Sequence, residues 1–302
     1  MDAKKHEKFS GRRLVVFGAG FVGGELARQA LARGMRVTAL TRNAEKAAAL
    51  ARLGAEAIEA DLAGDGWHAR VAGAADFVVN CVGAGGGGLA GYRRSYVGGM
   101  RSVSAWAARA AAGTLVYTSS TSVYPQDGGV RVDETAPTEA ADEAGKILLE
   151  AEALARGCAC GRWFILRLAG LYGPGRHRLL DELRAGAAAL PGRGAHHLNL
   201  VHRDDAVAAI WSALDAPADC TGGIFNVADD CAATRSEVAA WLAARLGVAA
   251  PAFTDAAAGG RRAVSPDRII DNARIKSALG WRPRFPDFRA GYENLLSQPE
   301  PL

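Results

Sequence analysis

The sequence predicts an α/β protein built on a doubly wound parallel sheet, followed by a small C-terminal lobe. Two observations predict this class. Short apolar runs rich in β-branched residues alternate with longer Ala/Leu-rich segments of helical periodicity through the first two-thirds of the 302-residue chain. After Gly173-Pro-Gly175 the alternation loosens. We therefore expect a disordered leader over residues 1–11, a dinucleotide-binding core over 12–170, and over 171–302 the rest of the sheet plus a small lobe.

The first element is a buried strand, Leu14-Val-Val-Phe17, which leads directly into a turn with glycines at positions 18, 20 and 23. In a turn of this spacing, Gly18 permits the tight bend and Gly20 permits close approach of a pyrophosphate. Gly23 permits close packing of the following helix on the strand. The alternative is a glycine-rich turn without a ligand.

The helix expected near residues 21–33 begins at this turn. Its first N–H groups, from Phe21 onward through Val22, would face the phosphates, where the positive end of the helix dipole also favours an anion. The sequence thus predicts a dinucleotide-phosphate site.

The residues after the second strand, 35–40, indicate the type of dinucleotide. A ribose-binding carboxylate is expected about 20 residues beyond the glycines, but this chain has Thr41 and Arg42 there. A guanidinium suits a 2′-phosphate because it forms bidentate, charge-assisted hydrogen bonds. NADP(H) is therefore favoured and NAD(H) is the alternative, unless Arg42 only begins a solvated helix.

Asp61 and Leu62 follow a third expected strand. The Asp61 carboxylate is placed either to meet an adenine ring edge or to cap the next helix. The remaining elements are then expected in alternation: strand 76–82, helix 95–112, strand 114–118, helix 139–156, strand 163–168, helix 204–216, strand 223–228 and helix 234–247, with a mobile loop at 256–260.

Composition excludes several classes of protein. The formal net charge is +4, but no dense basic block occurs outside residues 4–8, so nucleic acid is not an expected partner. No apolar run is long enough to span a membrane. The leader lacks a secretion signal, and the five cysteines form no disulfide or metal pattern, so we expect a reducing cytoplasm.

Several segments together resemble the extended short-chain dehydrogenase/reductase superfamily, specifically its NAD-dependent epimerase/dehydratase-like proteins, and the glycine spacing resembles the atypical members. These segments are the glycine turn, Val116-Tyr-Thr-Ser-Ser-Thr-Ser-Val-Tyr124, Leu166-Arg-Leu-Ala-Gly-Leu-Tyr-Gly-Pro-Gly175, Leu200-Val-His-Arg-Asp-Asp205, Gly223-Ile-Phe-Asn-Val-Ala228 and Leu279-Gly-Trp-Arg-Pro283. The resemblance implies a Rossmann-type fold and a small polar substrate. It also implies a homodimer through the helices at 95–112 and 139–156.

The same resemblance implies further cofactor contacts. Cys81, Val82 and Gly83 follow the fourth strand, where the backbone passes close to the cofactor in such folds. The glycines after Gly83, as far as residue 91, suggest a flexible flap.

The catalytic pattern of that family is incomplete here. Ser120 matches the residue that polarises a carbonyl, and Lys146 matches the lysine of a Tyr-x-x-x-Lys pair, where it would also hold the nicotinamide ribose. The tyrosine position holds Asp142. An aspartate has a reference pKa of about 3.9 and is an anion at neutral pH, so it cannot donate a proton. Asp142 and Lys146 could instead form a helix-surface ion pair, and Tyr124 could carry the proton or line a pocket.

Two functions are therefore open from the sequence. One is an NADP(H)-binding oxidoreductase or epimerase/dehydratase-like enzyme, which retention of Ser120 and Lys146 favours. The other is a catalytically silent NAD(P)-binding module that senses redox state, which Asp142 favours.

Overall fold

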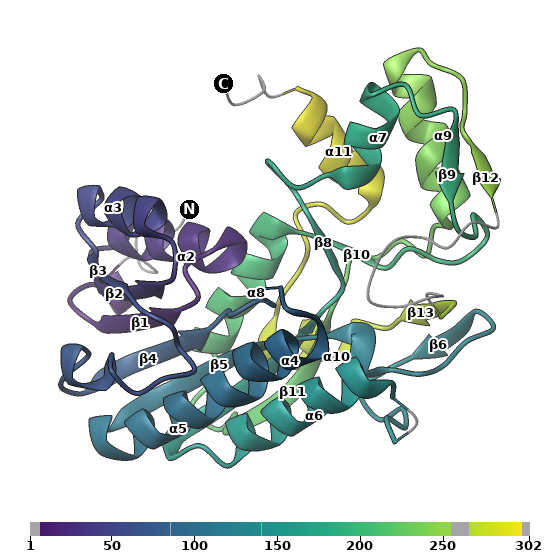
Figure 1. Cartoon of the computed structure of the whole chain (residues 1–302). Coiled ribbons are helices and arrows are strands. Elements are labelled where there is room, and N and C mark those ends of the chain that lie inside the picture. Colours follow the sequence, from purple (N-terminus) through teal and green to yellow (C-terminus); the bar gives the residue numbers. More distant parts are fainter. Residues whose placement is uncertain (1–6, 85, 140, 255–265, 298–302) are drawn as a thin grey trace. The chain divides into compact units, whose positions relative to one another are not determined.

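The computed structural model describes residues 7–84, 86–139, 141–254 and 266–297 (Figure 1). The chain divides into two compact units, and both are discontinuous in sequence. Unit 1 comprises Met1–Val123, Ala141–Arg167 and Ala206–Phe225, and unit 2 comprises Tyr124–Ala140, Leu168–Asp205 and Asn226–Leu302. The sequence-based boundary at residue 170 thus lies close to one crossing between the units, whereas residues 206–225 return to unit 1.

The central sheet has seven parallel strands in the order β11-β7-β5-β4-β1-β2-β3, as predicted for a Rossmann-type fold. Its strands are β1 (Arg13–Phe17), β2 (Arg36–Thr41), β3 (Glu56–Glu59), β4 (Ala75–Asn80), β5 (Ala112–Ser120), β7 (Cys160–Leu168) and β11 (Gly222–Val227). The order reverses direction at β1, which pairs with both β2 and β4. Ligands of open α/β sheets bind at such a switch point, beyond the carboxyl ends of the strands.

The helices associated with this sheet are α2 (Phe21–Ala32), α3 (Ala44–Arg52), α4 (Gly88–Arg93), α5 (Gly99–Ala110), α6 (Glu143–Arg156) and α8 (Arg203–Leu214), with short 3-10 turns η1 (His68–Arg70) and η3 (Thr121–Val123). Figure 1 shows α5 and α6 side by side across one face of the sheet. On α8, Trp211 donates a hydrogen bond from Nε1 to Gln29 on α2 at 2.9 Å. Because helices cover both faces of the sheet, the β1 residues from Leu14 to Phe17 are fully buried.

The structure differs from the helix expected over residues 95–112 in where the helical segment starts and in how regular it is. Helix α4 already begins at Gly88, and a π-helical turn, η2 (Arg94–Gly98), joins it to α5. Part of the expected glycine flap is therefore helical. A Cβ at Gly91 would overlap the carbonyl oxygen of Gly86, so the helix packs directly against its own preceding loop.

The expectation of a disordered leader is wrong for its described part. Residues 7–9 are helical, and Phe9 is buried. Its ring lies 5.6 Å from the ring centroid of Phe77 and 5.1 Å from that of Trp211. A buried aromatic side chain contributes enough apolar contact to order this short segment. Residues 1–6 lie outside the described residues.

Unit 2 contains the remaining elements: β6 (Val130–Val132), β8 (Gly170–Tyr172), α7 (Arg178–Arg184), β9 (Ala189–Pro191), β10 (Leu200–His202), α9 (Arg235–Leu246), β12 (Ala252–Thr254), β13 (Arg268–Ile270), α10 (Ala273–Leu279) and α11 (Phe288–Leu296). The strands of this unit form three separate two-stranded parallel sheets, β10-β8, β12-β9 and β13-β6. Its core includes Leu180, Val238, Leu242 and Phe288. The expected loop at 256–260 lies outside the described residues.

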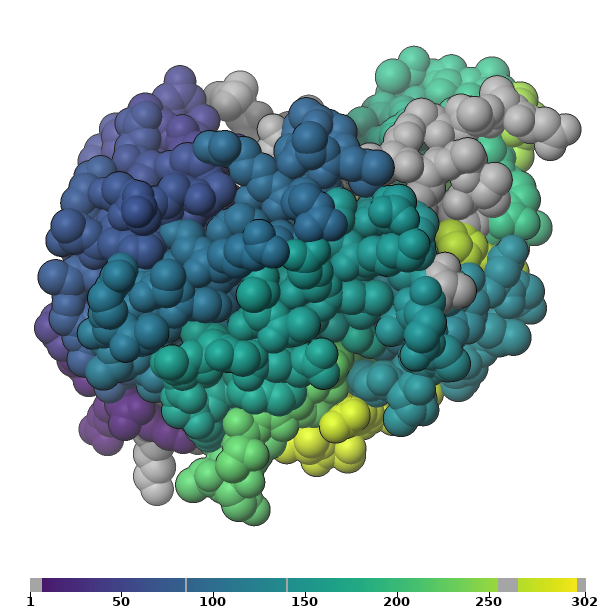
Figure 2. Space-filling model, turned by 60° about the horizontal axis from the view of Figure 1, so that its bottom comes forward, coloured from purple at the N-terminus to yellow at the C-terminus, as the bar shows by residue number. Residues whose placement is uncertain are grey.

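The outer surface of α5 and α6 is exposed to solvent. In the space-filling view of Figure 2 the blue-to-teal surface of this part of the chain occupies the centre of the face drawn toward the viewer. This is the surface through which the resemblance implies a homodimer, which stays a prediction. No helix within the described ranges is long and apolar enough to cross a membrane.

Candidate functional site

The glycine turn between β1 and α2 has the geometry of a phosphate-binding turn. Gly18 has φ of +83°, and a Cβ there would lie 2.7 Å from the backbone nitrogen of Val82. A Cβ at Gly23 would lie 2.5 Å from the carbonyl oxygen of Gly18. Both positions therefore require glycine, because a side chain would collide with main-chain atoms.

Gly20 differs from both. A Cβ at Gly20 would meet only the carbonyl oxygen of Gly18, at 3.9 Å, so the space beside this residue is open. Gly20 is also the N-cap of α2 and offers no side chain to accept from the first-turn N–H groups. The first turn contains no acidic residue. A pyrophosphate fits here, since backbone donors and the helix dipole are available and nothing fills the space.

Arg42 directly follows the end of β2. Thr41 is buried, and its hydroxyl accepts from Asn43 N–H at 3.2 Å. Asn43 is the N-cap of α3 and accepts from Lys46 N–H at 2.7 Å. Arg42 is exposed and makes no hydrogen bond or ion pair with another described residue. It therefore precedes the helix cap, and its guanidinium is available to an anion.

Asp61 has partners within the chain. Its carboxylate accepts from Ala63 N–H at 3.0 Å and from the guanidinium of Arg94 at 2.7 and 3.1 Å. These hydrogen bonds, with the Ala63 contact strongest, hold the pKa of Asp61 below its ordinary value. The guanidinium of Arg42 lowers it further by its charge. Asp61 thus closes an Asx turn. No helix starts at this position, so the expectation that Asp61 caps the next helix is wrong.

Some of the other residues predicted to contact the cofactor already use their backbone groups in hydrogen bonds within the protein. Leu62 is buried, and its carbonyl accepts from Trp67 Nε1 at 3.3 Å. The N–H of Cys81 donates to Phe17 at 2.8 Å, and the N–H of Val82 donates to the side chain of Asn80 at 3.1 Å. Gly83 is exposed with open space beside it. Gly83 thus has room for a ligand, and the contacts predicted for Leu62, Cys81 and Val82 stay predictions.

The three candidate catalytic residues of unit 1 lie at the end of β5 and the start of α6. Ser120 is the last residue of β5 and is half-buried. Asp142 is the N-cap of α6, and its carboxylate accepts from Gly145 N–H at 2.7 Å. Because that cap fixes the start of the helix, α6 begins at Glu143 and not near residue 139.

Lys146 lies in the first turn of α6 and is exposed. Its ammonium pairs with Glu143 at 2.8 Å, and this hydrogen bond raises the pKa of the lysine. The ammonium of Lys146 therefore pairs with Glu143, whereas the sequence suggested Asp142 as its partner.

Tyr124, the other candidate for proton transfer, belongs to unit 2. Its side chain is fully buried, and its hydroxyl donates to Asn226 Oδ1 at 2.8 Å. The amide of Asn226 donates in turn to the carbonyl oxygen of Asp271 at 3.1 Å. These contacts favour a structural role for Tyr124 over proton transfer.

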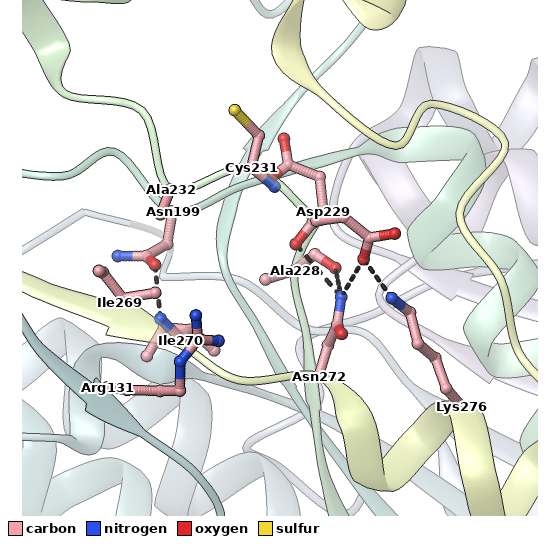
Figure 3. Close-up of a pocket in the computed structure, with 11 residues that line it drawn as sticks. Arg131, Asn199, Ala228, Asp229, Cys231, Ala232, Ile269, Ile270, Asn272 and Lys276 are labelled. Carbon is pink, nitrogen blue, oxygen red and sulfur yellow. Dashed lines mark hydrogen bonds and ion pairs between the residues drawn. The ribbon is translucent and has the colours of Figure 1, made fainter.

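Unit 2 contains a cavity of about 340 Å³ between β6, β13, α10 and the loop after β11 (Figure 3). Its polar side chains bond to neighbouring protein groups: Asn199 accepts from Ile270 N–H at 2.7 Å, and Asn272 donates to Ala228 at 2.8 Å. Lys276 pairs with Asp230. None of the sequence-predicted site residues lines this cavity.

Two buried titratable groups of unit 2 make its stability depend on pH. Burial raises the pKa of Asp229, on the cavity wall, to about 8, and lowers the pKa of His202 to about 4. The folded chain thus holds a proton on Asp229 that the unfolded chain loses near pH 4, so stability falls as pH rises from about 4 toward 8. The neutral His202 imidazole contributes stability that is lost as pH falls from about 6.5 toward 4.

We expect Asp229→Asn to raise the free energy of unfolding at pH 8 by at least about 1 kcal/mol, because asparagine copies the protonated acid and one pKa unit corresponds to about 1.4 kcal/mol. The gain should shrink toward pH 5. Urea unfolding between pH 5 and 8 measures it, with exposed Asp219→Asn as the control. Parallel pH curves for the parent and Asp229→Asn would contradict this account.

The fold and the glycine turn define a dinucleotide-binding protein of the Rossmann type. The profile of the NAD dependent epimerase/dehydratase family matches residues 14–228. The chain belongs to this family. The resemblance seen in the sequence is thereby confirmed.

Two curated sequences are similar over part of their length. Protein YeeZ of Escherichia coli K12 is 36% identical over 173 residues, which is 57% of this chain and 59% of YeeZ. A 3-diazoavenalumate denitrifying reductase of a Streptomyces species is 32% identical over 139 residues, 42% of this chain and 45% of that protein. The chain therefore matches less than two-thirds of either relative.

A solved structure shares the fold over almost the whole chain. The UDP-glucuronic acid 4-epimerase of Bacillus cereus, in complex with UDP-glucuronic acid and NAD, superposes with a TM-score of 0.78. It covers 93% of this chain and 96% of its own, at 19% identity. At that identity the likeness shows the fold alone.

Arg94 is the residue near this site that the sequence analysis missed. It lies in the π-helical turn, and its partner Asp61 is 33 residues earlier in the chain. Nothing in the local sequence signals a pair at that separation. Among the described residues, no group of three or more His, Cys, Asp or Glu side chains is arranged to hold a metal.

Proposed function

We propose that this protein is an oxidoreductase that binds a nicotinamide dinucleotide and prefers NADP(H). The observation that carries the proposal is the contrast among the three turn glycines. A Cβ at Gly18 or at Gly23 would meet main-chain atoms at 2.7 and 2.5 Å respectively, whereas the space beside Gly20 is open at the N-terminus of α2. When bound, the cofactor supplies or accepts a hydride.

The residues assigned to the cofactor follow from their positions. Gly20, Phe21, Val22 and Gly23 would surround the pyrophosphate at the start of α2, and Arg42 would hold the 2′-phosphate. Gly83 supplies open space at the end of β4. Lys146 would hydrogen-bond the nicotinamide ribose, a role that needs an ammonium and no tyrosine.

The substrate class follows from Asp142. A carboxylate that caps α6 is an acceptor of hydrogen bonds and supplies no proton at neutral pH. Reduction of a ketone or aldehyde requires a proton on oxygen, which Tyr supplies in relatives with the complete pattern. We therefore assign to this site a small polar electrophile that needs no proton from the protein at that position, such as a diazonium or iminium cation.

Two observations support this class. The exposed side chains of Asp142, Glu143 and Lys146 lie together at the start of α6, and because Lys146 pairs with Glu143 they carry a net negative charge, which favours a cationic group over an anionic one. One of the similar sequences is named as a reductase that acts on a diazo compound and removes its nitrogen.

Turnover with NADPH tests the proposal. We expect the protein to reduce an aryl diazonium or cyclic iminium probe, and the loss of NADPH absorbance measures this reduction. We expect little turnover of simple ketones, aldehydes or nucleotide sugars. Efficient reduction of a ketone by the unmodified protein would overturn the substrate class. Failure to bind either NADPH or NADH in calorimetry would overturn the whole proposal.

Arg42→Ala tests the cofactor preference. We expect NADPH to bind more tightly than NADH in calorimetry, and the variant to lose most of that difference. A charge-assisted hydrogen bond contributes about 1.5–3 kcal/mol, or roughly 10- to 150-fold in affinity.

Arg52→Ala is the matched control, because it removes an equally exposed charge from the far end of α3. It should leave the preference unchanged. Equal affinity of the unmodified protein for the two cofactors would refute the role of Arg42.

A second candidate function, a non-catalytic NAD(P)-sensing module, is favoured by one specific observation. The tyrosine position is occupied by a helix cap, and the adjacent lysine is paired with Glu143. Tight cofactor binding without turnover of any of the probes above would select this alternative.

A further inference from the structure

Two cysteines close in sequence follow the last turn of α6, at the start of β7. Cys158 is buried and Cys160 is half-buried. The N–H of Cys160 donates to the carbonyl oxygen of Cys158 at 2.8 Å, which bends the chain into a γ-turn around Ala159. From spacing alone, the five cysteines of the chain show no disulfide or metal pattern.

The turn brings the two cysteine side chains close enough for their sulfur atoms to interact. This interaction raises the pKa of Cys158 and lowers that of Cys160, and a backbone hydrogen bond from Leu115 lowers the pKa of Cys160 further. The Cys160 thiol itself donates a hydrogen bond to the carbonyl oxygen of Arg162, at 3.2 Å. Cys160 is thus both the more acidic and the more exposed thiol of the pair.

The backbone also permits a bond between the sulfurs. Disulfides span Cα separations of roughly 4.4–6.8 Å, and residues two apart in a bent chain fall within that reach. Ala159, between the cysteines, is exposed, so the turn can adjust without disturbing the core.

We propose that Cys158 and Cys160 form a reversible dithiol–disulfide pair that is oxidised by peroxides, with Cys160 as the attacking residue and Cys158 as the resolving residue.

The chemistry is complete with a peroxide as the oxidant. The Cys160 thiolate attacks one peroxide oxygen, the O–O bond breaks, and hydroxide leaves and takes up a proton to become water. Cys160 is now a sulfenic acid, having lost two electrons. The Cys158 sulfur attacks the Cys160 sulfur, the S–O bond breaks, and the departing oxygen leaves as water with the Cys158 proton.

The other cysteines provide a contrast. Burial raises the pKa of Cys81 to about 12, and it also raises the pKa of Cys231. Neither thiol has a hydrogen-bonded cysteine beside it among the residues that the structure describes. The paired site lies beyond the C-terminal end of α6, whereas Asp142 and Lys146 lie at its other end, about 20 Å away for a helix of this length. Its oxidation can therefore be measured independently of cofactor binding.

Trypsin gives a direct readout. Cleavage after Arg156 and Arg162 releases one peptide, residues 157–162, which contains both cysteines and no other. The reduced full-length protein is treated with hydrogen peroxide, alkylated and digested. We expect this peptide to lose both alkylation sites together with the mass of two hydrogens, and dithiothreitol to restore them.

The variants assign the two roles. Cys158→Ser should accumulate a sulfenic acid on Cys160 that dimedone traps, whereas Cys160→Ser should show little dimedone labelling of Cys158. Cys220→Ser is the control and should oxidise as the parent does. Two alkylated thiols in the peroxide-treated parent peptide, or dimedone labelling confined to Cys158, would overturn the proposal.

Discussion

Gly20→Val should abolish binding of NADPH and NADH while the protein remains folded. The side chain would occupy the open space that we assign to the pyrophosphate, at the position where a Cβ meets only one atom of the protein, at 3.9 Å. Backbone donors at the start of α2 would then be screened from the phosphates. In calorimetry we expect affinity to fall at least about 100-fold, corresponding to about 2.7 kcal/mol, with an unchanged circular dichroism spectrum.

Gly24→Ala is the matched control, since a Cβ there makes only an ordinary contact of 3.6 Å with Ala19. It should bind cofactor as the parent does. Gly18→Val should instead unfold the turn, because its side chain would strike Val82. Unchanged cofactor affinity in a folded Gly20→Val protein would show that the phosphates lie elsewhere.

Asp142→Tyr should create or raise carbonyl reductase activity. The substitution restores a hydroxyl four residues before Lys146, with Ser120 at the end of the neighbouring strand. A tenfold gain in kcat/KM corresponds to only about 1.4 kcal/mol of barrier, and a positioned general acid supplies more than this. Steady-state rates with a panel of simple ketones and aldehydes measure the gain.

The same substitution removes the cap of α6. We expect it to cost about 1 kcal/mol in the free energy of unfolding, so stability is measured alongside activity. Asp142→Asn is the control, because it keeps a capping oxygen and supplies no phenol; it should keep stability and gain no activity. If the unmodified protein reduces a ketone well and Asp142→Ala destroys that activity, Asp142 is itself the acid.

The parts of the fold that depend on local pattern were predictable. The strand at residues 14–17 and the turn glycines are identified by apolar content and spacing alone, and the parallel sheet follows from the regular alternation of strands and helices. The start of α6 was not, because several residues before Glu143 suit a helix, and only the hydrogen bond from Gly145 selects Asp142 as the cap. Local propensity does not rank competing caps.

Interactions between distant residues were the least accessible from the sequence. The contact of Phe9 with Trp211 joins positions about 200 residues apart, so the leader could not be recognised as packed. The pairing of Cys158 with Cys160 depends on a γ-turn, which spacing alone does not specify.

The π-helical turn at Arg94–Gly98 sets the angular phase between α4 and α5. Each residue of an α-helix advances the chain by about 100° around the axis, so the extra residue in a π-helical turn rotates everything before it relative to everything after it. Arg93 and Arg101, on opposite sides of this turn, both reach Glu150 on α6, at 2.6 and 2.8 Å. A chain one residue shorter here would keep Arg101 on Glu150 but turn Arg93 away from it. The length of this turn therefore decides which way the segment before α5 faces.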